Sequence, residues 1–269
     1  MSNPIDIELL EAYANTLLRH GRPGAPYWFV GVEEGGSDSV AEIAERLERW
    51  DRGGRQDVHY LAPYPGSKHL PDDGRRAHLQ RTWANQLRVV LGITGEPLHN
   101  ERVRELQTSA HGTEEGMTCL LELLPLPCPK TSDWLYGSLG LGEAFASKTT
   151  YRRSLLPARV AQILESARSQ PGGPVSLVFM AWGHREALTP SLPALETLEI
   201  GFGKNPGRAL IGVWENIVVA ICSHPGDRFN GSRNDFFHRL GQEIGVRADA
   251  VGTRAPRQGK SEQEVRDRA

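Results

Sequence analysis

The sequence predicts an α/β fold in which a central, mostly parallel sheet of four strands lies between two layers of helices. Four apolar runs have the length and β-branched character of buried strands: residues 27–32, 117–124, 175–182 and 216–222. Helical patterns separate these runs, and strands that alternate with helices form parallel sheets covered on both faces. We expect this three-layer α/β/α sandwich to be a single domain over residues 1–246, followed by a flexible charged tail over 247–269.

The first predicted strand has a helical pattern on either side. Residues 5–20 carry apolar side chains at helical spacing, and Gly21 follows as a stop signal. Residues 37–52 have an apolar side and a charged side, and either Ser37 or Ser39 can cap the helix that this pattern predicts.

Residues 53–76 contain three prolines and four glycines without a sustained period, which predicts a long loop. Loops of this length are usually functional or disordered. The remaining chain is expected to contain helices at residues 78–91, 155–167 and 235–244, and a short strand at residues 210–214.

The composition, with 39% hydrophobic and 24% charged residues, is ordinary for a soluble protein. The sequence has no run of 18 apolar residues and no signal-peptide pattern, so we expect a cytoplasmic protein without a membrane partner. Cys119, Cys128 and Cys222 lack the spacing of a disulfide framework or a metal centre, and we expect reduced thiols. We expect no metal or organic cofactor, and a monomer. The net charge of -2 still allows a local basic face.

Polar residues stand at the ends of three predicted strands. Glu33 and Glu34 follow the first strand, Glu122 interrupts the second, and His224 follows the last. The carboxyl ends of parallel strands lie along one edge of a sheet, where open α/β sheets bind their ligands. Carboxylates and an imidazole at one edge are typical of a hydrolytic site. Each of these residues is also compatible with a structural role in a turn or an ion pair.

The order and spacing of four segments resemble the motifs of the uracil-DNA glycosylase superfamily. Residues 29–35 resemble its first motif, a strand followed by Gly, a variable residue, a polar residue and then Pro or Gly. Residues 117–124 resemble the strand that ends in a base-reading Asn, and residues 178–183 match the strand that ends in Trp-Gly. Residues 223–226 resemble the strand that runs into His-Pro-Ser, and paired Phe residues follow at 236–237.

The resemblance covers roughly residues 27–245 and implies an enzyme that extrudes a base from double-stranded DNA and hydrolyses its N-glycosidic bond. The sequence departs from the family pattern at four places. Glu33 replaces a shorter polar residue, Glu34 replaces Pro, Glu122 replaces Asn, and Gly226 replaces Ser.

The replacement at Glu122 bears on the substrate. An ionised carboxylate only accepts hydrogen bonds, so it would repel uracil O4 and suit an exocyclic amine such as cytosine N4. The absent Pro and the long loop indicate a roomier pocket. Within the superfamily, this combination looks like the bacterial anti-phage glycosylases that remove modified, for instance glucosylated, cytosines from phage DNA.

The resemblance implies roles for the strand-end residues. Glu33 is expected to stabilise the cationic sugar and orient the attacking water, and His224 to donate a hydrogen bond to the departing base. Glu122 is expected to contact the edge of the base. The base-binding set also includes Glu34, Tyr27 and Trp28, and the two aromatic residues either stack on the base or belong to the core.

The turn after the last strand is expected to contact DNA. Phe229 is an apolar residue in a polar turn and is either a wedge that replaces the extruded base or a buried residue. Arg228 and Arg233 can contact phosphates, although an ordinary solvated turn explains them equally well. Ser67 and Lys68 in the long loop are further candidates for contact with the DNA backbone.

Other functional classes remain open from the sequence. Glu33, Glu34 and Glu122 together could hold Mg²⁺ in a metal-dependent nuclease. The protein could also be a repair glycosylase for uracil or a damaged base, or a DNA-binding module that lacks catalysis, because a fold does not determine a function.

Overall fold

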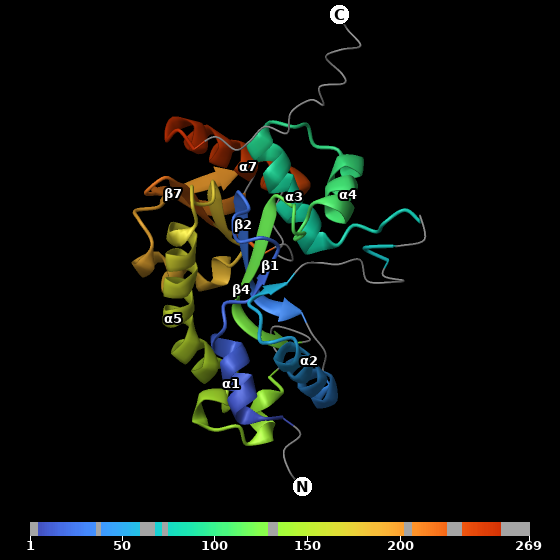
Figure 1. Cartoon of the computed structure of the whole chain (residues 1–269). Helices are drawn as coiled ribbons and strands as arrows, with labels where there is room; N and C mark the ends of the chain where they lie inside the picture. The colour runs from blue at the N-terminus through green and yellow to red at the C-terminus, as the bar shows by residue number, and fades with distance from the viewer. Residues whose placement is uncertain are drawn as a thin grey trace, which may run out of the picture.

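The computed structural model describes residues 5–35, 39–59, 68–71, 75–128, 134–201, 206–224 and 233–253, without the side chains of Glu34 and Arg233. One sheet runs through the middle of the molecule (Figure 1). Its strands in the described residues are β1 (Arg19–His20), β2 (Tyr27–Gly35), β3 (Val58–His59), β4 (Thr118–Cys128), β5 (Ser176–Phe179), β6 (Glu196–Ile200), β7 (Gly207–Trp214) and β8 (Ile217–Cys222).

The α/β class is confirmed, but the predicted number of strands is wrong. The described sheet has eight strands in the order β3-β1-β4-β2-β5-β8-β7-β6. The four predicted strands are its parallel centre, β4-β2-β5-β8. The expected short strand at 210–214 is part of β7, which pairs antiparallel with β8 and with β6. At the other edge, β1 pairs antiparallel with β4 and parallel with β3.

Helices cover both faces of this sheet. They are α1 (Ile7–Asn15), α2 (Val40–Arg52), α3 (Arg81–Thr94), α4 (Asn100–Ser109), α5 (Lys148–Ser169), α6 (Arg185–Leu188) and α7 (Arg233–Ala250). Short 3-10 turns are η1 (Tyr136–Leu139), η2 (Glu143–Phe145), η3 (Trp182–His184) and η4 (Thr189–Ser191). Helix α4 was not predicted, and α5 begins seven residues before the predicted residue 155.

Local signals explain several helix ends. Ser39, one of the two predicted caps, accepts a hydrogen bond from the backbone N–H of Glu42 at 3.4 Å and begins α2. Ser147 caps α5 through the N–H of Thr150 at 3.0 Å. Gly95 ends α3 with a φ of 73°, a left-handed conformation that glycine adopts without strain.

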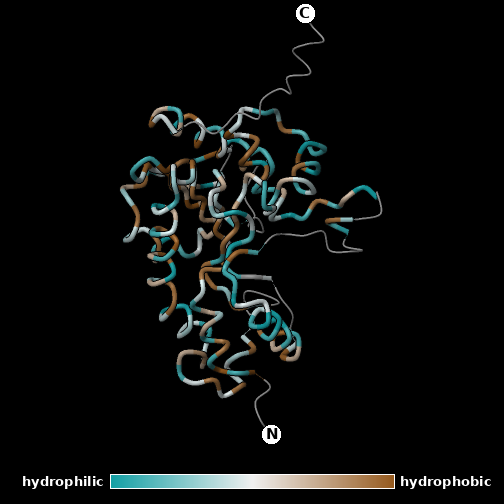
Figure 2. Tube along the Cα trace, viewed as in Figure 1, coloured by the Kyte–Doolittle hydropathy of each residue, from teal (hydrophilic) through white to brown (hydrophobic). Residues whose placement is uncertain are grey.

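The alternation of side chains along the strands divides the core into two layers. Trp28 and Val30 of β2 pack on the side of α1, α2 and α5, whereas Phe29 packs on the side of α3 and α7. The paired residues Phe236 and Phe237 of α7 are both buried in the second layer. Figure 2 shows apolar residues concentrated on the central strands and polar residues on outlying helices such as α2 and α4.

Two glycines allow α3 and α7 to approach closely. A Cβ atom on Gly92 would lie 2.1 Å from the carbonyl oxygen of His238, and one on Gly241 would lie 2.1 Å from the carbonyl oxygen of Val89. Side chains at these positions would push the helices apart, so the glycines fix this layer against the sheet.

The C-terminal helix runs past the predicted domain boundary. Helix α7 ends at Ala250, within the segment predicted as a tail, and residues 254–269 lie outside the described part of the chain. In the described helices, no segment combines the length and the apolar character that a bilayer crossing requires.

Candidate functional site

The parallel strands end together at one edge of the sheet. In chain order the central strands are β2, β4, β5 and β8, and their spatial order is second, first, third, fourth. The chain therefore passes from β2 to β4, its neighbour in one direction across the sheet. Strand β5 is the neighbour of β2 in the opposite direction. This reversal is a topological switch point, and ligands of open α/β sheets bind outside the carboxyl ends of the strands at such a point. Glu33 of β2 and the η3 turn after β5 flank it.

Glu33 and His224 follow one row of the sheet by the same number of residues. Val30, Phe179 and Ile221 form one row across β2, β5 and β8, and Glu33 and His224 each follow that row by three residues. Strand β5 lies between β2 and β8, so these two strands are separated by two strand spacings, roughly 10 Å. His224 is exposed.

Glu33 forms a buried ion pair with Lys148. The Nζ atom of Lys148 lies 2.7 Å from Oε2 and 2.9 Å from Oε1 of Glu33, and the two side chains are only 11% and 6% exposed, respectively. Lys148 is the first residue of α5, where a positive charge opposes the helix dipole. The negative charge of the Glu33 carboxylate compensates for the unfavourable position of the Lys148 ammonium group at the start of the helix.

Three further groups surround this ion pair. Burial raises the pKa of the Cys128 thiol, and Lys148, which hydrogen-bonds to it, opposes that rise. Burial lowers the pKa of His184, Arg152 lowers it further, and Glu33 opposes both. The charges of Arg152 and Glu33 therefore both act on His184, with opposite effects on its pKa.

These neighbours of Glu33 were not assigned a role from the sequence. Arg152 follows Lys148 by four residues on α5 and therefore lies on the same side of that helix. His184 closes the η3 turn directly after the Trp-Gly pair. The rule that placed polar residues at the ends of the other strands would have found His184, whereas nothing local links Lys148 to a strand 115 residues away.

The carboxylate of Glu122 lies against Gly31 in the neighbouring strand. The two residues are register partners, and a Cβ atom on Gly31 would be 2.1 Å from Oε2 and 2.7 Å from Cδ of Glu122. Glu122 is half-buried, and its strand neighbour two residues earlier, Leu120, packs in the α3/α7 layer. Glu33 lies two residues further along β2 than Gly31, roughly 7 Å closer to the open edge.

A buried amide lies in the same layer as Glu122. Gln86 of α3 is 4% exposed, and it precedes Val89 and Val90, which pack on Phe29 and Leu120, by one helical turn. Within the described residues, its Oε1 atom accepts no hydrogen bond. A buried amide oxygen in this state can accept a hydrogen bond from a ligand.

Of the two roles expected for Tyr27 and Trp28, their burial supports the core rather than stacking on a base. Both begin β2 at the end opposite Glu33, six and five residues away, which is roughly 17–20 Å along a strand. Trp28 is 0% exposed, and its indole N–H donates to the carbonyl oxygen of Pro23 at 3.1 Å. Tyr27 is 2% exposed, and burial, followed by the charge of Glu96, raises the pKa of its phenol well above the usual value. Both are core residues.

The predicted DNA-contacting residues are only partly described. Lys68 is exposed, and its carbonyl oxygen accepts a hydrogen bond from the N–H of His78 at 2.7 Å. Arg228, Phe229 and Ser67 lie outside the described residues. The side chains of Arg233, at the start of α7, and of Glu34, in β2, do so as well.

Among the described residues, no group of three or more His, Cys, Asp or Glu side chains is arranged to hold a metal ion. The carboxylate of Glu33 is instead bound through both oxygens to the ammonium group of Lys148.

Comparisons with models of protein families, with curated proteins and with solved structures find no match to this chain.

Proposed function

We propose that the protein is a monofunctional DNA glycosylase that hydrolyses the N-glycosidic bond of an extruded modified cytosine and leaves an abasic site. The observation that supports this proposal most directly is the position of Glu33 and His224. Each follows the row of Val30, Phe179 and Ile221 by three residues toward the carboxyl edge, and β5 lies between their strands. Two strand spacings, roughly 10 Å, leave room for one nucleotide between a carboxylate and an imidazole.

The proposed reaction separates charge, and each side of that separation has a partner. As the C1′–N bond breaks, its electron pair leaves with the base and the sugar becomes cationic. His224 donates a hydrogen bond to the base, where negative charge develops. Glu33 orients a water molecule whose oxygen bonds to C1′, and the water's second proton is released to a carboxylate or to solvent while the base gains a proton.

Lys148 limits what Glu33 can do in this scheme. Its ammonium group competes with the cationic sugar for the same carboxylate. Each carboxylate oxygen has a second lone-pair site, so Glu33 can hold a water molecule while Lys148 stays bound. The primary role of Glu33 is therefore to position water, and Lys148 fixes the carboxylate in the orientation that this role needs.

The base-reading role of Glu122 is supported by its place in the sheet. It lies beside Gly31, in the α3/α7 layer and deeper than Glu33. Cys222 packs in the same layer, and strand alternation favours the same side for His224, two residues later. A base inserted from the open edge would meet Glu33 and His224 near its sugar and Glu122 at its far edge. A carboxylate there suits an exocyclic amine.

One assay tests the proposed reaction. Duplexes that carry uracil, hydroxymethylcytosine or glucosylated hydroxymethylcytosine are incubated with the protein in EDTA and then treated with alkali. We expect strand breaks at a modified cytosine and none with Glu33→Gln. Breaks that require Mg²⁺ and appear without alkali would indicate a nuclease. Tight binding without release of any base would indicate a DNA-binding module, and either result overturns the proposal.

The substrate class is tested separately with Glu122→Asn. An amide can both donate and accept, so this variant should lose preference for the amine-bearing base and gain activity on uracil. Glu115→Gln is the matched control, because Glu115 lies on the surface near the amino ends of the strands. An unchanged ranking of the three duplexes with Glu122→Asn would exclude Glu122 as the base-reading residue.

A further inference from the structure

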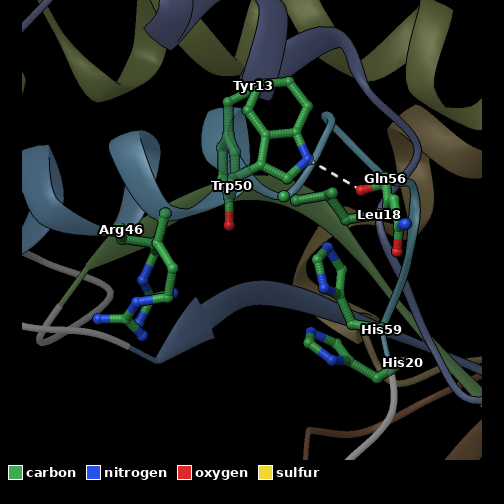
Figure 3. Close-up of a pocket in the computed structure, with 9 residues that line it drawn as sticks. Tyr13, Leu18, His20, Arg46, Trp50, Gln56 and His59 are labelled. Carbon is green, nitrogen blue, oxygen red and sulfur yellow. Dashed lines mark hydrogen bonds between the residues drawn. The ribbon is translucent and has the colours of Figure 1, made fainter.

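A second polar cavity lies beside the sheet edge formed by β1 and β3. It has a volume of ≈ 330 Å³, is open to solvent on one side and is lined by residues of α1, α2 and these two short strands (Figure 3). Its walls include Tyr13, His20, Arg46, Arg49, Trp50 and His59. None of the described residues that line it is Asp or Glu. A pocket with several cationic and aromatic groups and no carboxylate favours an anionic ligand with a flat ring.

The basic groups come from elements that fix their spacing. Arg46 and Arg49 lie one turn apart on α2, so both guanidinium groups can reach one anion. Arg49 also pairs with Glu45 at 3.0 Å on the exposed side of α2. His20 and His59 are register partners in β1 and β3, and their ring centroids are 5.9 Å apart.

The cavity has two chemically different ends. Figure 3 shows the guanidinium of Arg46 on one side and the imidazoles of His20 and His59 on the other, with Trp50 and Tyr13 along the wall between them. Trp50 is 6% exposed, its indole N–H donates to the carbonyl oxygen of Gln56 at 2.9 Å, and the Arg55 guanidinium lies 5.9 Å from its ring centroid, so Trp50 forms part of the cavity wall. Guanidinium groups bind phosphate, whereas imidazole and indole rings pack against nucleobases.

We propose that this cavity binds a single nucleotide, with its phosphate at Arg46 and Arg49 and its base against His20 and His59. A volume of ≈ 330 Å³ is at the lower end for small-molecule sites and suits one nucleotide rather than two. The proposal does not depend on the glycosylase reaction, because none of the residues that carry it belongs to the strand-end site.

The charge of one cavity residue acts on the segment that follows β4. Burial raises the pKa of Tyr136, and the guanidinium of Arg46 opposes that rise. The phenol of Tyr136 donates to the carbonyl oxygen of Pro127 at 3.0 Å, next to Cys128, which is the register partner of Gly35. The bound nucleotide can therefore belong to a DNA strand that reaches the strand ends or can be a free mononucleotide.

Isothermal titration calorimetry of the full chain tests this site and separates the two sources. The probes are the four deoxynucleoside 5′-monophosphates, the corresponding deoxynucleosides, inorganic phosphate and a single-stranded oligonucleotide. We expect a monophosphate, the oligonucleotide or both to bind at least about ten-fold more tightly than a nucleoside or inorganic phosphate. A nucleoside lacks the phosphate group that the arginines would bind, and inorganic phosphate lacks the base. Binding of the monophosphates identifies a free nucleotide, and binding of the oligonucleotide alone identifies a DNA strand.

Variants connect the binding to this cavity. Arg46→Gln should weaken it by about ten-fold or more, which corresponds to the loss of one charge-assisted contact. Arg52→Gln, which removes the same charge from the exposed end of α2, should change it less than about two-fold. His59→Leu should weaken the binding of the nucleotide more than the binding of inorganic phosphate. The proposal is overturned if no probe binds, if phosphate alone binds as tightly as the nucleotides, or if Arg46→Gln and Arg52→Gln behave alike in proteins with unchanged thermal unfolding.

Discussion

The carboxylate of Glu122 occupies the space that a side chain on Gly31 would need. A Cβ atom at Gly31 would lie 2.1 Å from Oε2 of Glu122, well inside any normal contact distance. The two residues are neighbours across β2 and β4, so the conflict cannot be relieved by sliding one strand alone. Gly31 therefore leaves room for the Glu122 carboxylate in its present position, and a larger residue at position 31 would require the end of that side chain to move.

Gly31→Ala should destabilise the protein through this contact. The added methyl group would turn the end of the Glu122 side chain out of its place, and because that side chain is flexible, we expect a cost at the lower end of the overpacking range, about 1 kcal/mol. The double variant Gly31→Ala/Glu122→Ala should recover most of the lost free energy of unfolding, as measured by urea denaturation. Gly24→Ala is the control, because a Cβ atom there meets nothing within 4 Å. If Gly31→Ala lowers the free energy of unfolding equally with Glu122 and with Ala at position 122, the destabilisation does not arise from contact with the Glu122 carboxylate.

Lys148→Met should destabilise the protein strongly, because it leaves the carboxylate of Glu33 buried without its cation. Breaking one side of a buried ion pair costs about 3–5 kcal/mol, whereas replacing both partners by apolar residues is often neutral. The double variant Glu33→Leu/Lys148→Met should therefore be more stable than Lys148→Met. Arg168→Met, which breaks an exposed ion pair with Glu165 on the same helix, should have little effect. Chemical denaturation monitored by circular dichroism measures the free energy of unfolding of these three variants and of the unmodified protein.

The two histidines at the strand ends should differ in their effect on base release. His224→Asn should lower the single-turnover rate by roughly 10²–10³-fold, because a donor to the departing base is lost. His184→Asn should lower it by less than about ten-fold, since burial and Arg152 make His184 a neutral neighbour of Glu33. If His184→Asn lowers the rate more than His224→Asn does, His184 and not His224 is the donor to the departing base. Thermal unfolding of both variants controls for loss of structure.

Acid should destabilise the protein through His111. This residue is 1% exposed, and burial lowers its pKa from the ordinary value of 6.5 to about 3. Its Nδ1 atom lies 3.1 Å from the hydroxyl oxygen of Thr118. Between pH 6.5 and 3, the unfolded chain binds a proton that the folded protein excludes. The free energy of unfolding should therefore fall with decreasing pH, by up to about 1.4 kcal/mol per pH unit from this group.

Urea denaturation at several pH values checks the slope. His111→Gln should flatten the dependence between pH 6.5 and 4.5, even if it lowers stability at neutral pH. His99→Gln changes an exposed histidine and should keep the slope of the original protein. An unchanged slope in His111→Gln would assign the acid sensitivity to other groups.

The central strands and most long helices could be predicted because their signals are local. The apolar residues of β2, β4, β5 and β8 are continuous in the sequence, and strands buried on both faces have this pattern. The two-residue strands β1 and β3 are too short for any periodicity to indicate them. Helix α4 is strongly polar, and few of its residues, among them Val103 and Leu106, face the core, which leaves a weak apolar pattern.

The sequence by itself determined which residues can form strands, helices and caps, because those preferences depend on neighbours a few positions away. It also indicated that Glu33 and His224 follow parallel strands and so share an edge. Only the tertiary structure decided that Lys148 binds Glu33, that Tyr27 and Trp28 are buried at the opposite end of β2, and that His20 and His59 meet beside α2. These contacts join segments far apart in the chain, and their geometry follows from strand order and helix packing, which no local pattern specifies.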